Sequence, residues 1–79
     1  MDVAITQVQH ETSRAIVRDR RGIVIGVIER QPLIGKLIAR DQRGLVAGLY
    51  DERSRTTRDA RGRLIGQTNM LPVLLFRER

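Results

Sequence analysis

The chain has no cysteine and no tryptophan, and its aromatic residues are one tyrosine and one phenylalanine. The absence of cysteine excludes a disulfide framework and a thiolate metal site. The shortage of large aromatic side chains limits the core, and a chain of 79 residues buries only about 60% of the surface that it exposes when unfolded. We therefore expect one domain over residues 1–79 that gains further burial by oligomerisation.

Long hydrophobic runs are absent as well. The longest apolar stretches, 23–28 and 71–76, fall far short of the roughly 20 residues that a membrane-spanning helix needs. The first residues do not combine a basic segment with an apolar one, as a signal peptide does. The sequence therefore predicts a protein of the cytoplasm or of a phage-type particle, with no signal peptide, transmembrane segment or membrane partner.

Negative charge is scarce relative to positive charge. Nine acidic residues oppose 15 basic ones, which gives a net charge of +6 at pH 7, and 14 of the basic residues are arginine. Net charge bears on partners and solubility rather than on the fold. The arginine excess is compatible with phosphate binding and equally with a GC-rich coding sequence, so it does not by itself identify a partner.

One phrase is repeated along the chain. Arg-Asp-x-Arg-Gly-x-x-x-Gly begins at Arg18, Arg40 and Arg58, with spacings of 22 and then 18 residues. Its Asp can accept the backbone N–H of the residue two positions on, and its first Gly supplies the positive φ of a type I turn that closes into a G1 bulge. The predicted turn residues are Asp19, Gly22, Asp41, Gly44, Asp59 and Gly62.

Residues with high strand propensity flank each turn, and short strands at regular spacing are typical of an all-β domain. The sequence predicts consecutive antiparallel β-hairpins at approximately 14–29, 36–51 and 54–69, with further strands at 3–8 and 71–77. Glycine in the middle of a strand is unfavourable unless a bend or a close backbone approach requires it. The recurrence of Gly26, Gly48 and Gly66 therefore favours strands crowded around a common axis.

The strands that follow the turns are apolar on both faces. Alternation places Ile23, Ile25 and Val27 on one face of the first such strand, with Leu45, Ala47 and Leu49 as their counterparts in the second. A sheet with one face in water would alternate apolar and polar residues instead, so we expect another subunit to cover this second face. The predicted interface residues are Ile23, Ile25, Val27, Leu45, Leu49, Tyr50 and Phe76.

The Asp-x-x-Gly-x-x-x-Gly hairpin repeat, over roughly residues 14 to 69, resembles the small bacterial and phage β-hairpin repeat proteins called beta-flower proteins. In these, several hairpins are arranged around a pseudo-rotation axis. The resemblance implies a small barrel or flower-like arrangement completed by oligomerisation, and a structural or accessory role. It implies no catalytic residues, because these modules carry none that are shared across the family.

Residues suited to catalysis are few. Asp19, Asp41 and Asp59 are explained by the turns, and no Asp-x-Asp-x-Asp-Gly calcium loop is present. His10 is the only histidine and has no cysteine to activate. We therefore expect no enzymatic activity, no cofactor, no metal site and no small-molecule substrate.

The arginines of the repeat leave two interpretations open. If the hairpins converge, these side chains gather at one end as a basic rim suited to a nucleic-acid backbone. Alternatively, each arginine pairs with its neighbouring aspartate or keeps a β-edge soluble. The sequence thus predicts a structural, assembly or adaptor module that binds itself or a larger protein assembly, with an arginine-rich nucleic-acid-binding module as the alternative. The candidate nucleic-acid contacts are Arg18, Arg21, Arg40, Arg43, Arg58 and Arg61.

Overall fold

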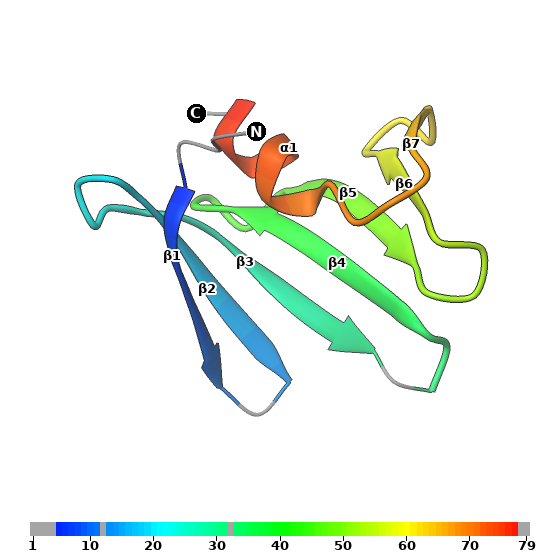
Figure 1. Ribbon diagram of the computed structural model, residues 1–79, viewed down its shortest axis with the longest axis horizontal. Coiled ribbons are helices and arrows are strands. Elements are labelled where there is room, and N and C mark those ends of the chain that lie inside the picture. Colours follow the sequence, from blue (N-terminus) through cyan, green and yellow to red (C-terminus); the bar gives the residue numbers. More distant parts are fainter. Residues whose placement is uncertain (1–4, 12, 32, 78–79) are drawn as a thin grey trace.

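The computed structural model describes residues 5–11, 13–31 and 33–77, which form one antiparallel sheet and a short helix (Figure 1). Each strand pairs with its neighbours in sequence, in the order β1 to β7. The prediction of an all-β chain of consecutive antiparallel hairpins is therefore confirmed, with the addition of the helix. The elements are β1 (Ile5–Glu11), β2 (Arg14–Asp19), β3 (Val24–Gln31), β4 (Lys36–Asp41), β5 (Val46–Asp51), β6 (Thr56–Asp59), β7 (Leu64–Gly66) and α1 (Leu71–Arg77).

The sheet is open and does not close into the predicted barrel. Its outermost strands in the pairing order are β1 and β7. A closed barrel would require β1 and β7 to pair with each other. The chain after β7 instead leaves the sheet and forms α1, which packs on β3, β4 and β5. The sheet curves around this helix (Figure 1).

The prediction of a strand at 71–77 was wrong. Asn69 Oδ1 accepts the Leu71 backbone N–H at 3.1 Å, and the Met70 carbonyl accepts the Leu74 N–H at 3.1 Å. Pro72 lies in the first turn, where a helix needs no N–H from it. The spacing of Leu71, Leu74 and Leu75 places three buried side chains on one helix face. A short run that is apolar throughout does not distinguish a buried helix from a buried strand by its periodicity.

The core lies between α1 and the sheet face that it covers, called here the inner face. Thr57 fastens the segment that enters the helix, since its hydroxyl donates to the Thr68 carbonyl and accepts the Met70 N–H. Tyr50 and Phe76, which the sequence predicted as interface residues, are partly buried and pack against this core within the chain. The buried hydrophobic residues are Ala15, Val17, Ile25, Ile28, Ala39, Ala47, Leu71, Leu74 and Leu75.

A β-bulge next to each turn changes which residues share a face. In the first hairpin Val17 pairs with Gly26 and Arg18 with Val24, so Ile25 is the extra residue. Ile25 is 2% exposed and belongs to the core beneath α1. The equivalent residues are Ala47 and Ile65. Strict alternation, which the sequence interpretation assumed, fails at every bulge.

The predicted second apolar face is therefore divided. Ile25 and Ala47 are in the core, and Ile23 and Leu45 lie at the turns with 50% and 59% of their surface exposed. The alternation beyond the bulges places Val27 and Leu49 on the opposite side of the sheet, called here the outer face.

Candidate binding surface at the arginine turns

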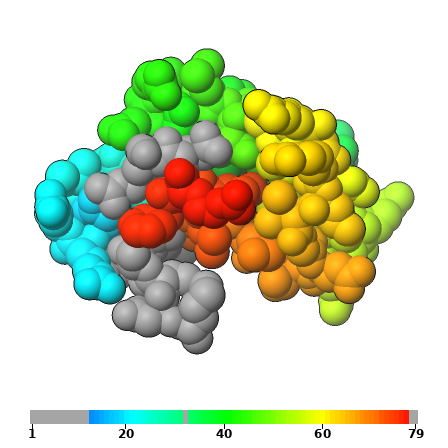
Figure 2. All heavy atoms as spheres, turned by 90° about the horizontal axis from the view of Figure 1, so that it is seen from above, coloured from blue at the N-terminus to red at the C-terminus, as the bar shows by residue number. Residues whose placement is uncertain are grey.

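The three repeated turns lie at the same end of the sheet. In a sheet of consecutive hairpins every second connection is at the same end, and the turns join β2 to β3, β4 to β5 and β6 to β7. Figure 2, seen from above, shows these turns in cyan, green and yellow around the red helix. We call this region the turn end and define it by residues 18–22, 40–44 and 58–63.

Each turn is held by the carboxylate of its aspartate. Asp19 Oδ1 accepts the backbone N–H groups of Arg21 at 2.9 Å and Ile23 at 3.0 Å. The Gly22 N–H donates to the Asp19 carbonyl at 2.9 Å, and Gly22 has a φ of +81°. Asp41 and Asp59 make the same contacts in the other two turns, where Gly44 and Gly62 also have positive φ. The aspartates thus determine turn geometry.

The first arginine of each repeat is tied to its own turn. Arg18, Arg40 and Arg58 each donate from Nη1 to the carbonyl of the turn glycine, at 2.9, 3.2 and 3.0 Å. Arg40 also donates from Nε to Glu29 Oε1 at 3.0 Å. These contacts hold each guanidinium against its turn through the glycine carbonyl, whereas the sequence interpretation expected local pairing with the neighbouring aspartate.

The second arginine of each repeat lies at the tip of its turn. Arg21, Arg43 and Arg61 are exposed, and it is their backbone N–H groups that bond to the aspartates. All six candidate arginines are therefore brought to the turn end. Two more lie there that the sequence interpretation did not single out, Arg20 and Arg63. Their signal was their position within or directly after the turn phrase.

The turn end carries most of the net charge of the chain. Its residues include eight arginines and three aspartates, a net charge of +5 out of a total of +6. Each aspartate accepts backbone N–H groups within its own turn. Exposed aliphatic side chains accompany the arginines, namely those of Ile23, Leu45, Val46 and Leu64. The arrangement is suited to an anionic partner.

Asp59 offers a pH-dependent test of the turns. Hydrogen bonding from the Arg63 backbone, opposed by some desolvation and supported by the Arg63 guanidinium, lowers the pKa of Asp59 below its usual value of 3.8. Because the pKa of Asp59 is lower in the folded chain than in the unfolded chain, its ionised carboxylate stabilises the fold. This contribution is fully present at a pH above the unfolded-state pKa and is lost as the pH falls through the folded-state pKa. We expect NMR titration of the Asp59 carboxyl to give a pKa below 3.8.

The variant Arg63→Gln separates the two contributions. It removes the guanidinium, which donates from Nε to Asp59 Oδ2 at 2.8 Å, and retains the backbone donor. Since the backbone hydrogen bond is the largest cause of the shift, the pKa of Asp59 should rise only part of the way toward 3.8. A complete return to that value would contradict the backbone role.

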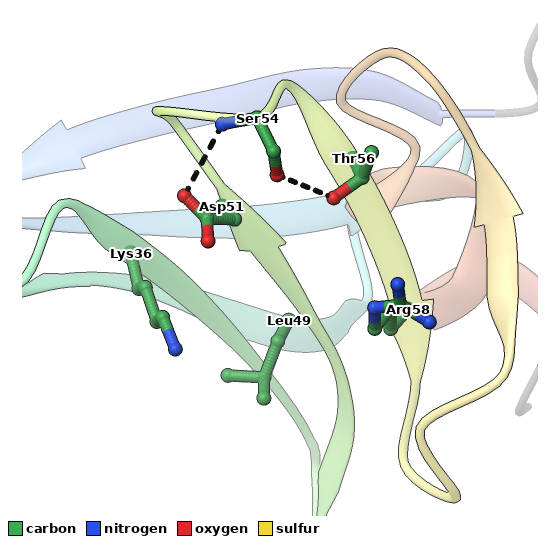
Figure 3. A pocket seen from close by; sticks show the side chains of 6 residues that line it. All are labelled: Lys36, Leu49, Asp51, Ser54, Thr56 and Arg58. Atoms are coloured by element: carbon green, nitrogen blue, oxygen red, sulfur yellow. Dashed lines mark hydrogen bonds between the residues drawn. The ribbon is translucent and has the colours of Figure 1, made fainter.

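The outer face contains a small hollow of about 180 Å³ over β4, β5 and β6. Figure 3 shows its lining side chains, which come from β4, β5, β6 and the turn between the last two. Asp51 accepts the backbone N–H groups of Arg53 and Ser54, and the Ser54 and Thr56 hydroxyls lie 2.7 Å apart. These polar groups therefore shape the β5–β6 turn. The lining residues are Lys36, Leu49, Asp51, Ser54, Thr56 and Arg58.

The described residues include no group of three or more His, Cys, Asp or Glu side chains that could hold a metal ion. The backbone of His10 pairs with Ala15 in the sheet. No helix in the described ranges has the length and hydropathy to cross a bilayer.

The chain was compared with protein-family models, with curated proteins and with solved structures. None of the three comparisons gave a match.

Proposed function

We propose that this chain is a non-catalytic assembly module that associates with a second copy of itself through the outer face of the sheet. It acts as a structural or adaptor component of a larger protein assembly, such as a phage or prophage particle. The observation that carries the proposal is an apolar strip on the side of the sheet opposite α1. The strip consists of Ile16, Val27, Ile38 and Leu49, all partly exposed.

The strip is continuous across four strands. Ile16 pairs with Val27 and Ile38 pairs with Leu49. The two pairs are diagonal neighbours, because Val27 is two residues from Glu29, which lies opposite Ile38. Aliphatic side chains in this arrangement are suited to stacking against a second sheet, as in a β-sandwich.

The charges around the strip favour an antiparallel stack of two copies. On the turn-end side the outer face carries Arg18, Arg40 and Arg58, whereas at the opposite end Glu29 lies across from Arg14 and Asp51 lies across from Lys36, so that the charges there balance. A twofold arrangement with opposed strand directions keeps the two arginine rows apart, and like charges facing each other would oppose association.

The non-catalytic part of the proposal is supported by the roles of the aspartates. Asp19, Asp41 and Asp59 each accept two backbone N–H groups of their own turn. General acid or base chemistry requires a carboxyl group within reach of a substrate proton and with a pKa near the working pH. The pKa of Asp59 is shifted in the opposite direction, downward.

The oligomeric state tests this proposal. We expect sedimentation at micromolar concentration to show a dimer or a larger assembly of the unmodified chain. Ile38→Lys, in the centre of the strip, should give a monomer with unchanged far-UV circular dichroism. Leu33→Lys adds the same charge at a residue that is 99% exposed and should leave the assembly intact.

A well-folded monomer of the unmodified chain at micromolar concentration would overturn the proposal. If Ile38→Lys does not fold, Ile16→Lys provides a second probe, because Ile16 lies on the strip at the strand next to β1.

A further inference from the structure

We propose that the turn end binds the phosphate backbone of a nucleic acid, without reading its sequence. The inference goes beyond the assembly role, because it concerns the tips of the hairpins and not the apolar strip. It rests on the concentration of charge at the turn end, on the regular placement of the arginines and on the way in which the turns hold them.

The arginines are placed at regular intervals. Equivalent residues Arg18, Arg40 and Arg58 lie on β2, β4 and β6, which are alternate strands of the sheet. Neighbouring strands are separated by 4.7–4.9 Å, so successive arginines are about 10 Å apart along the sheet. Each is followed by a tip arginine at the same position of its turn. The sheet thus brings three similar pairs of arginines to the turn end, where the three turns lie in an arc around α1 (Figure 2).

The guanidinium groups of Arg18, Arg40 and Arg58 are also held in place before a ligand arrives. Arg58 donates one N–H to the Gly62 carbonyl at 3.0 Å, and Arg40 is held by the Gly44 carbonyl and by Glu29. A guanidinium has five N–H donors, so these contacts leave others for a ligand. Prior positioning lowers the entropy that binding must remove from a long side chain.

A nucleic-acid backbone fits this row better than an acidic peptide does. A duplex carries one negative charge per about 1.7 Å of its axis. Phosphates therefore lie close to each arginine of the row, whatever the distance between successive arginines. A peptide would need carboxylates that match the interval of the hairpins. Arginine, which supplies 14 of the 15 basic residues here, also matches phosphate geometry with its planar fork of donors.

Sequence readout is not expected at this surface. Binding of single strands through their bases relies on aromatic platforms, and both aromatic side chains of the chain pack against the core beneath α1. The aliphatic side chains beside the arginines, such as Ile23 and Leu45, can contact sugar faces without selecting a base. Contacts to phosphate position a protein on nucleic acid and carry no sequence information directly.

The proposal is tested by fluorescence anisotropy with a labelled 20-base-pair DNA duplex at 50 and 200 mM KCl. Six phosphate contacts predict a slope of about −5 for log K against log salt, and hence binding roughly a thousandfold weaker at the higher concentration. Replacing the three tip arginines together, Arg21→Gln, Arg43→Gln and Arg61→Gln, should weaken binding at least tenfold at 50 mM. It should also make the slope shallower by about one for each arginine removed.

The matched control removes three charges elsewhere. Arg14→Gln, Lys36→Gln and Arg53→Gln lie at or near the opposite ends of the strands and change the net charge by the same amount. This variant should retain the salt slope of the unmodified chain. Sedimentation of the tip variant should show an unchanged assembly, so failure of DNA binding and failure of self-association are distinguished.

Four results would overturn the proposal. The first is no binding to the duplex at 50 mM KCl, and the second is an equal loss of binding in the two triple variants. The third is competition by polyglutamate that matches unlabelled duplex charge for charge, which would indicate an acidic protein partner. The fourth is binding to vesicles that contain phosphatidylserine without binding to DNA, which would indicate an anionic lipid surface.

Discussion

Leu75→Ala is expected to lower the free energy of unfolding by about 2–5 kcal/mol, the usual cost of truncating a buried leucine. Leu75 is 1% exposed and belongs to the core that α1 forms with the sheet. A domain of this size has only about 4–12 kcal/mol of total stability, at roughly 0.05–0.15 kcal/mol per residue. The substitution therefore removes a large part of what keeps the chain folded.

The measurement is urea denaturation followed by far-UV circular dichroism. Val73→Ala is the matched control, because Val73 lies in the same helix but is only partly buried. It should cost less than Leu75→Ala. An equal loss in the free energy of unfolding for the two variants would mean that the leucine face of α1 does not pack against the sheet.

Gly26→Ala is expected to destabilise the fold by about 1–3 kcal/mol, the range for overpacked cores. A Cβ atom on Gly26 would lie 2.5 Å from the Arg40 carbonyl oxygen and 2.6 Å from Leu75 Cδ2. The first of these neighbours is backbone and cannot move without disturbing the pairing of β3 with β4. The substitution therefore forces a displacement of either the strand or the helix.

Gly66→Ala is the control for this effect. The nearest neighbour of a Cβ there is the thioether sulfur of Met70, at the far end of a flexible side chain. The side chain can move aside, and replacing glycine restricts the unfolded chain, which favours folding. We expect the urea midpoint of Gly66→Ala to stay close to that of the unmodified chain. If the urea midpoint of Gly26→Ala also stays close to that of the unmodified chain, close packing does not explain why glycine occupies these positions.

The parts of the fold that the sequence predicted correctly are local. The spacing of Asp19 and Gly22 determines a turn within five residues, because the carboxylate, the backbone donors and the positive φ all lie inside the same segment. The same holds for the turns at Asp41 and Asp59, and this local chemistry fixes where the strands begin and end.

The parts that were wrong depend on contacts between distant segments. A bulge residue such as Ile25 has the composition of any strand residue, so nothing in the sequence marks the change of face. The role of Gly26 depends on Leu75, which is nearly fifty residues away in the chain. A helix forms at 71–77 in place of the predicted strand, and its buried leucines pack on the inner face over β3, β4 and β5.

The candidate site was predictable in its residues but not in its arrangement. The repeated phrase identified six arginines, and the sheet topology brings them to one end as the sequence allowed. The hydrogen bonds from Arg18, Arg40 and Arg58 to the turn carbonyls were not foreseen. They depend on the rotamers of the arginines within the folded turns.

The repeat glycines face α1 and the residue that precedes it in reverse order along the chain. Gly66 faces Met70, Gly48 faces Leu71 and Leu74, and Gly26 faces Leu75. The first hairpin of the repeat thus finds its core partner in the segment that leaves the ribosome after all of the strands. During synthesis the hairpins can form one by one, but the inner face of β3, β4 and β5 stays uncovered until the helix has emerged. Folding to the native state should therefore be a single late event, and the nascent sheet should remain a substrate for chaperones until then.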